Sequence, residues 1–150
     1  MQKKYFILIL SVVSILLCNS SCKKSSSGKT PEQLLTANTW KMMKDSGTLG
    51  TTAYYYVRGG SSNTVNLDGD SIKFDLNNTG TYYGNGASKS FTWNFSNSAE
   101  NELTWVVDLS SITTTVTWNI QTLNSTQLTY IETYDQSGTS WYGVITRSPN

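Results

Sequence analysis

The 150-residue sequence has no histidine, and no cysteine follows Cys22. Without histidine, neither a Ser-His-Asp nor a Cys-His catalytic arrangement can form, and the commonest metal ligand is missing. Without further cysteines, the rest of the chain can form neither a disulfide nor a thiolate metal site. A carboxylate hydrolase would need two acids facing each other in a cleft. The close acidic pairs, Asp68 with Asp70 and Glu100 with Glu102, fall in predicted turns, where acids are usually solvated. We therefore predict no enzyme, no metal and no cofactor.

Charged residues are also scarce, at 14% of the chain, and their distribution is uneven. From Pro31 onward six basic residues stand against ten acidic ones, a net charge of −4. A mildly acidic domain without a basic stripe predicts no binding to nucleic acid. What is abundant instead is threonine, serine, asparagine, tyrosine and tryptophan, a composition typical of a β protein.

The N-terminus has the pattern of an export signal. Lys3 and Lys4 supply the positive start, and Tyr5 to Cys18 is a mostly apolar run of fourteen residues. This run is shorter than the roughly 20 residues that a membrane-spanning helix needs. Small residues, Ser20 and Ser21, stand just before Cys22, as signal peptidases require. The pattern predicts a cleaved secretory signal.

Strand periodicity is clearest from Glu102 to Ile120. Apolar residues alternate with polar ones on both sides of Ser110-Ser111, but the parity changes there. A turn with an even number of residues requires this change, because it pairs Leu109 with Ile112 and keeps both on one face. The pattern predicts an antiparallel hairpin with an apolar inner face and a threonine-rich outer face. Such a hairpin needs a second layer, or a sheet that curls onto itself, to cover the inner face.

The remainder of the domain repeats this pattern at intervals of ten to fourteen residues. Thr30, Pro31 and Gln33 predict a capped helix that ends near Ala37. The strands expected besides the hairpin are Thr39–Lys44, Thr51–Arg58, Ser71–Leu76, Thr81–Gly84, Lys89–Ser96, Gln127–Tyr134 and Thr139–Arg147. We therefore predict an all-β, antiparallel up-and-down barrel of about eight to nine strands with a short N-terminal helix. A two-sheet sandwich is the alternative.

The segment from Leu16 to Lys24 resembles a bacterial lipoprotein lipobox of the loose type found in Bacteroidetes. The resemblance implies a signal peptide at residues 1–21, a lipid anchor with palmitate-type acyl chains on Cys22, a tether at 22–30 and a domain at 31–150. It also implies attachment to the outer membrane in the cell envelope. Surface export in that phylum goes with an acidic signal after the cysteine. Here Lys23-Lys24-Ser25 stands instead, which favours the periplasmic side.

The domain itself resembles the lipocalin-like lipoproteins of Bacteroidetes. The resemblance rests on Asn38-Thr39-Trp40 in place of the usual Gly-x-Trp, on the segment Phe74 to Tyr82, on Trp118-Asn119-Ile120 followed by Leu128, and on a late arginine, Arg147. It implies a barrel whose mouth can hold a small apolar ligand. It also implies that Arg147 packs over Trp40 in a cation–π contact that closes one end of the barrel.

Inward-facing aromatic residues are the candidates for lining a ligand site. They are Trp93, Trp105, Trp118, Phe74 and Phe91. Such residues can equally be ordinary core packing, and the sequence leaves both interpretations open.

Adjacent aromatic residues give the alternative function. In Tyr54-Tyr55-Tyr56 and in Trp141-Tyr142, neighbours point to opposite faces of a strand, so at least one ring of each run points outward. Outward rings could bind a glycan or an envelope protein, or they could pair across strands for stability alone.

Overall fold

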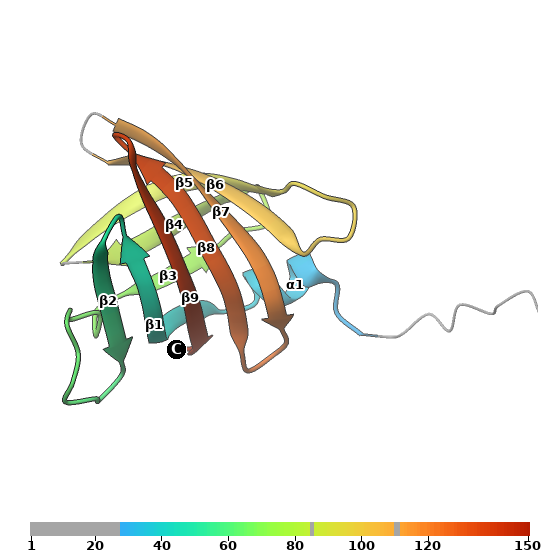
Figure 1. Ribbon diagram of the computed structural model, residues 1–150. Coiled ribbons are helices and arrows are strands. Elements are labelled where there is room, and N and C mark those ends of the chain that lie inside the picture. Colours follow the sequence, from blue (N-terminus) through green and yellow to red (C-terminus); the bar gives the residue numbers. More distant parts are fainter. Residues whose placement is uncertain (1–27, 85, 110–111) are drawn as a thin grey trace, which may run out of the picture.

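The computed structural model describes residues 28–84, 86–109 and 112–150 (Figure 1). The predicted signal peptide, the anchor residue Cys22 and most of the tether therefore lie outside the described residues. In the part of the chain that the structure describes, no helix is long and apolar enough to cross a membrane.

The helix α1 (Pro31–Thr36) begins where the sequence predicts it. The backbone N–H of Gln33 donates to the Thr30 hydroxyl, and the backbone N–H of Thr30 donates to the Gln33 side chain, which completes the predicted capping box. The helix lies at one end of the barrel, away from the β8–β9 turn (Figure 1). Leu35 is its fully buried residue, so α1 covers this end with an apolar side chain.

Nine antiparallel strands follow in the described residues, in agreement with the eight to nine that the sequence predicts. They are β1 (Thr39–Leu49), β2 (Thr52–Val57), β3 (Ser71–Phe74), β4 (Thr79–Gly84), β5 (Ala87–Phe95), β6 (Glu102–Leu109), β7 (Ile112–Leu123), β8 (Leu128–Gln136) and β9 (Thr139–Pro149).

Eight of these strands close into a barrel, because β1 pairs with both β3 and β9. The ninth, β2, is an additional strand that pairs with the second half of β1, from Lys44 to Leu49. β2 and β3 thus share one edge of β1, and residues 58–70 connect them. This closed barrel with one short helix fits the predicted lipocalin-like architecture, and the sandwich alternative is wrong.

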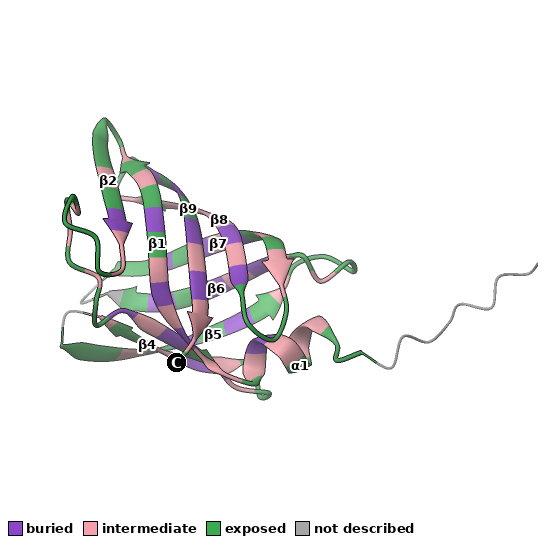
Figure 2. Cartoon of the chain, turned by 90° about the horizontal axis from the view of Figure 1, so that it is seen from below, coloured by how far each residue is buried: buried purple, intermediate pink, exposed green. Residues whose placement is uncertain are grey.

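The predicted hairpin is present in the predicted register, with Leu109 paired to Ile112. Buried and exposed residues alternate along the strands (Figure 2), so that one face of each strand is covered. Two apolar residues at the ends of predicted strands are exposed: Ile112, expected on the inner face, is 44% exposed at the end of its strand, and Leu76, which ends the strand predicted over Ser71–Leu76, is 67% exposed. Leu76 is outside because β3 ends at Phe74 and the chain turns, with the Asp75 amide bonded to the Thr79 carbonyl.

One irregularity changes which residues of β1 face inward. A β-bulge between Met42 and Lys44 shifts the pairing of β1 with β9. Strict alternation from Trp40 and Met42 would place Lys44 inside. The extra residue instead leaves Lys44 exposed and turns Asp45 into the barrel, where it is 7% exposed.

Candidate functional site

The two halves of the barrel interior differ in how they are filled. In the half next to α1, Phe74 makes edge contacts with Phe91, Trp93 and Trp118 at ring-centroid distances of 5.3 to 5.5 Å. Trp118 also stacks on Tyr130 at 3.7 Å. This aromatic cluster closes that half by packing against itself.

The other half holds a cavity of about 330 Å³. It extends from the middle of the barrel toward the β1–β2 and β8–β9 turns, and its wall combines apolar, aromatic and ionisable side chains. The lining residues are Met42, Asp45, Leu49, Tyr54, Val65, Leu67, Asp70, Tyr82, Trp105, Val107, Thr114, Val116, Glu132, Tyr134, Trp141 and Arg147.

Four buried polar atoms on this wall have no hydrogen-bond partner within the described part of the protein. They are Asp45 Oδ1, Trp105 Nε1, Thr114 Oγ1 and Trp141 Nε1. Native proteins leave few buried polar groups unpaired, because each one costs about 1–3 kcal/mol. All the unpaired atoms found in residues 28–84, 86–109 and 112–150 belong to residues that line one cavity. Their clustering makes this cavity the candidate functional site.

A buried ion pair forms the floor of the cavity. Arg147 Nη1 lies 2.7 Å from Asp70 Oδ1 and 3.1 Å from the Trp40 carbonyl oxygen, and Arg147 Nε donates to the Tyr130 hydroxyl. The Tyr82 hydroxyl donates to the other oxygen of Asp70. Both charges of the pair are therefore hydrogen-bonded as well as paired, which is the condition under which a buried ion pair is tolerated.

The carboxyl of Asp45 also lies on the cavity wall, but its Oδ1 has no hydrogen-bond partner in the described residues. Burial raises its pKa to about 6; the positive charge of Arg147 opposes the rise, and the negative charge of Asp70 adds to it. The proton is thus held more tightly than in solvent, because ionised Asp45 would be poorly solvated.

Glu132 of β8 is a further acid on the cavity wall. Burial raises its pKa to about 7, although the hydrogen bond from Trp118 Nε1 to Glu132 Oε2, 2.7 Å long, and the charge of Arg147 both act in the opposite direction. Nearby Asp45 and Asp70 add to the rise. A group that titrates near neutral pH inside a cavity marks a candidate functional site.

A pair of glycines makes room for the aromatic wall. Gly47 of β1 and Gly143 of β9 are paired across the strands. A Cβ atom on Gly143 would lie 2.6 Å from Trp141 Cζ2, and one on Gly47 would lie 2.9 Å from the same atom. The Trp141 indole therefore lies against the bare backbone, and Tyr54 and Tyr134 contact it at ring-centroid distances of 5.6 and 6.0 Å.

The structure separates the five predicted ligand-lining residues. Trp105 lies on the cavity wall. Trp93, Trp118, Phe74 and Phe91 belong to the aromatic cluster of the closed half, where Phe74 contacts the other three. For these four residues the core-packing interpretation describes what the structure shows.

The predicted pair of Trp40 and Arg147 comes together through different atoms than expected. Arg147 donates to the backbone carbonyl of Trp40, so a hydrogen bond takes the place of the expected cation–π contact. The Trp40 indole N–H donates to the Leu35 carbonyl of α1 at 2.8 Å. Trp40 thus links the helix to the barrel, and its neighbour Arg147 faces the cavity.

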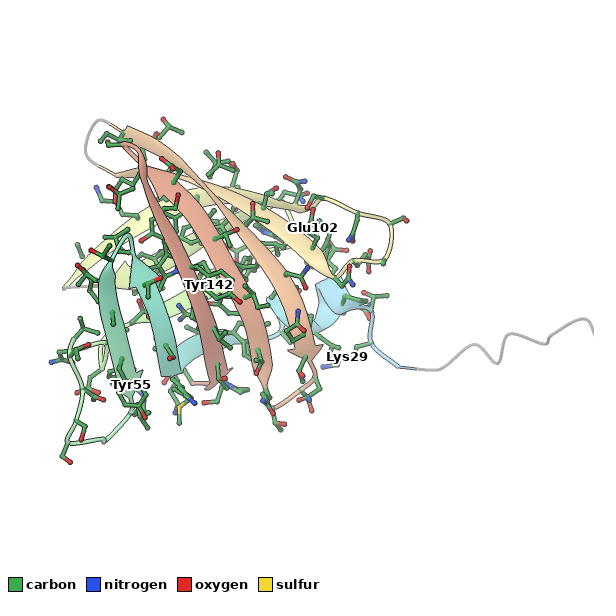
Figure 3. The ribbon with its side chains drawn as sticks, in the orientation of Figure 1. Lys29, Tyr55, Glu102 and Tyr142 are labelled. Atoms are coloured by element: carbon green, nitrogen blue, oxygen red, sulfur yellow. The ribbon has the colours of Figure 1, made fainter. Side chains whose placement is uncertain are left out.

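The predicted surface aromatics divide between the two faces. Tyr55 and Tyr142 are 41% and 52% exposed, and they come from β2 and β9, on either side of β1 (Figure 3). Tyr56 is fully buried, and Tyr54 and Trp141 line the cavity. Each of these two runs therefore places one ring on the outer face, because neighbours in a strand alternate, and β1 separates the two rings.

Sequence reasoning missed the acids of the cavity. Asp70 was expected to be solvated in a turn, but it is buried in the ion pair with Arg147. Asp45 was missed because the β-bulge changes the face of β1 on which it lies. Glu132 could have been found, because it falls on the apolar parity of its strand between Tyr130 and Tyr134.

Two further hollows are weaker candidates. One of about 300 Å³ lies beside the cavity, between residues 66–70 and β4, and shares Leu67, Asp70 and Tyr82 with it. Another of about 590 Å³ lies over β4, β5 and β6, where threonines and a serine supply much of its lining. None of the four residues with unpaired buried atoms lines either hollow.

The case for the site rests on the cavity and its chemistry. Among the described residues, no group of three or more acidic, cysteine or histidine side chains is placed to hold a metal ion. A scan against protein-family models and a search of curated proteins found no match to this chain.

Proposed function

We propose that this protein is a lipid-anchored, lipocalin-like protein of the cell envelope that binds a small molecule in the barrel cavity. The observation that carries the ligand part is the set of four unpaired buried polar atoms on the wall of one 330 Å³ cavity. A cavity of that size is at the lower end of the range for small-molecule sites.

The same wall refines the kind of ligand that we expect. Val107, Val116 and Met42 can contact an apolar body. Two indole N–H groups, a hydroxyl and the Asp45 carboxyl have no partner in the described residues, and the Glu132 carboxyl lies on the same wall. The proposed ligand is therefore amphipathic rather than purely apolar.

The lipid anchor and the location in the cell envelope are proposed from the N-terminal sequence. The basic start, the short apolar run and the small residues before Cys22 support lipid attachment at that cysteine. Replacing Cys22 with serine should move the protein from the membrane fraction to the soluble fraction and abolish labelling by radioactive palmitate. Labelling of the Cys22→Ser variant equal to that of the wild type would contradict the proposal.

Native mass spectrometry of the protein extracted from its own host tests the ligand part. Val106 and Val107 are neighbours on opposite faces of β6: Val107 lines the cavity, whereas Val106 is 36% exposed. We expect a co-purifying small molecule with the wild type and with Val106→Trp. Val107→Trp should lose it, because the larger side chain fills the cavity. Retention of the molecule by a folded Val107→Trp variant would show that it binds elsewhere.

A further inference from the structure

The cavity wall carries more negative than positive charge. Asp70 and Arg147 neutralise each other at 2.7 Å. Asp45 and Glu132 remain, so one cation faces three carboxyls and the wall carries a charge of −2 when all three are ionised. The other titratable groups on the wall are the phenols of Tyr54, Tyr82 and Tyr134. Burial raises the pKa of Tyr134 to about 12, and it raises the pKa of Tyr82 as well. Lys89 shares the inner face of β5 but is not part of the cavity wall.

The two remaining acids have hydrogen-bonding capacity to spare. Asp45 Oδ1 is buried and has no partner in the described residues. Within the same part of the chain, the one hydrogen bond found to the Glu132 carboxyl is that from Trp118. An ionised carboxylate can accept up to about four hydrogen bonds, so both acids could accept donors from a ligand.

Aromatic rings line the same cavity as these acids. Tyr54, Tyr134 and Trp141 form one contact group, and Trp105 lies 6.1 Å from Tyr82 on the other side of the wall. The faces of such rings attract cations, and their edges and the valines nearby suit an apolar body. The unpaired indole N–H groups of Trp105 and Trp141 add donors for an acceptor atom on that body.

We propose that the ligand is a small organic ammonium ion with an aromatic or aliphatic body, whose charged nitrogen is held by Asp45 and Glu132. This inference rests on the proposed function of the cavity and specifies its ligand class. A cation would supply both acids with hydrogen-bond donors and compensate the buried negative charge. Its binding should therefore release protons below about pH 7, since burial raises the pKa of Asp45 to about 6 and that of Glu132 to about 7 in the free protein.

Three probes with one body and different head groups test the charge requirement. Tyramine carries an ammonium, tyrosol a hydroxyl and 3-(4-hydroxyphenyl)propanoate a carboxylate on the same hydroxyphenyl ring. Binding is followed on the full chain, extracted in mild detergent, through the indole N–H signals of its five tryptophans in a nitrogen-labelled NMR sample. Trp40 and Trp93 donate to backbone carbonyls near α1 and serve as internal references.

At about pH 8 we expect tyramine to shift the signals of Trp105 and Trp141 with saturation, at an affinity about tenfold or more above that of the other probes. The affinity for tyramine should fall about tenfold near pH 5, where both acids are protonated. Asp45→Asn and Glu132→Gln should each weaken tyramine binding by about tenfold without changing that of tyrosol. Asp75→Asn and Glu32→Gln, which remove acids outside the cavity wall, are the matched controls and should have no effect.

The results separate failure of this inference from failure of the proposed function. If tyrosol or the propanoate shifts the cavity signals as strongly as tyramine, the ammonium proposal is wrong but the cavity still binds small molecules. Equal tyramine affinity in Asp45→Asn, Glu132→Gln and the wild type would also overturn it. If no probe shifts these signals and no molecule co-purifies with the protein, both proposals are wrong.

Discussion

Gly143 illustrates how the absence of a side chain shapes the candidate site. Its missing Cβ leaves space that the Trp141 indole occupies, and its strand partner Gly47 does the same from β1. The indole therefore lies along the wall instead of across the cavity. At this position a glycine is required by close approach, not by backbone conformation.

Gly143→Ala should consequently close part of the cavity. The new methyl group would lie 2.6 Å from Trp141 Cζ2 and push the indole inward. We expect weaker ligand binding and a loss of about 1–3 kcal/mol in the free energy of unfolding, measured by urea denaturation. Gly69→Ala is the control, because its Cβ would meet no atom within 4 Å. Unchanged stability and binding in Gly143→Ala would contradict this account of the glycine pair.

Arg147 is the residue on which the interior charges depend. It is 3% exposed and binds Asp70, Tyr130 and the Trp40 carbonyl. Removal of one member of a buried ion pair leaves the other member charged and unpaired, which costs more than the pair contributes.

Arg147→Met should therefore destabilise the protein by about 3–5 kcal/mol in urea denaturation. Adding Asp70→Asn should recover part of this loss, because the unpaired charge disappears with it. Lys73→Met removes the exposed pair of Lys73 with Asp75, 3.4 Å long, and should cost about 1 kcal/mol or less. Equal losses in Arg147→Met and Lys73→Met would show that burial of the pair is unimportant.

Among the elements, α1 is the one that closes the barrel away from the cavity. Its N-terminus is fixed by the Thr30–Gln33 capping box, and its C-terminal part is tied to β1 by the bond from Trp40 Nε1 to the Leu35 carbonyl. The Leu35 side chain is fully buried and belongs to the main core cluster. A short helix with little intrinsic stability is thus held by its contacts with the barrel.

Leu35→Ala should cost about 2–5 kcal/mol, because it leaves a cavity under the helix. Leu76→Ala is the matched control: Leu76 is 67% exposed, so the same chemical change should cost little. Thermal or urea unfolding of both variants measures the difference. A small effect of Leu35→Ala would mean that α1 is dispensable for the fold.

A second element, the connection from Arg58 to Asp70, forms the part of the cavity wall between β2 and β4, two strands that do not pair with each other. Asn63 is hydrogen-bonded to both backbone groups of Val57, and Arg58 donates to the carbonyls of Met42 and Asp68. Val65 and Leu67 of this connection line the cavity. The connection therefore forms part of the cavity wall, and these hydrogen bonds fix it to β1 and β2.

For the whole molecule, the cavity acids predict how stability depends on pH. The folded-state pKa values of Asp45 and Glu132, about 6 and about 7, lie above the ordinary values of 3.8 and 4.5. The folded protein thus holds protons that the unfolded chain releases, so the contribution of these acids is present at low pH and is lost as pH rises from about 4 to about 7.

Urea denaturation in steps of pH tests this contribution. From about pH 4 to pH 8 the ligand-free wild type should lose stability relative to Asp45→Asn/Glu132→Gln, on the order of 2–3 kcal/mol for Asp45 alone. The double variant Asp75→Asn/Glu32→Gln should behave as the wild type does. Parallel pH curves for the wild type and the cavity double variant would show that the two acids ionise in the folded state as they do in solvent.

The sequence by itself determined the architecture of this protein. Two-residue periodicity, turn residues and the parity change before Ile112 depend on neighbours in the chain, so the strands, the 109–112 pairing and the capped helix could be read directly. The apolar faces of the strands had to be covered, by a barrel or by a second sheet, and the pairing of β1 with β9 decided for the barrel. The sequence also suggested Trp105 as a residue of the cavity.

Only the tertiary structure decided which residues make the site. The β-bulge turned Asp45 inward, the pairing of β1 with β9 brought Arg147 to Asp70, and packing assigned four of the five predicted aromatics to the closed half. Each of these outcomes depends on residues far apart in the chain. Alternation gives the face of a strand on which a residue lies, whereas bulges, register and the volumes of opposing side chains determine whether that face meets a packed core or an open cavity.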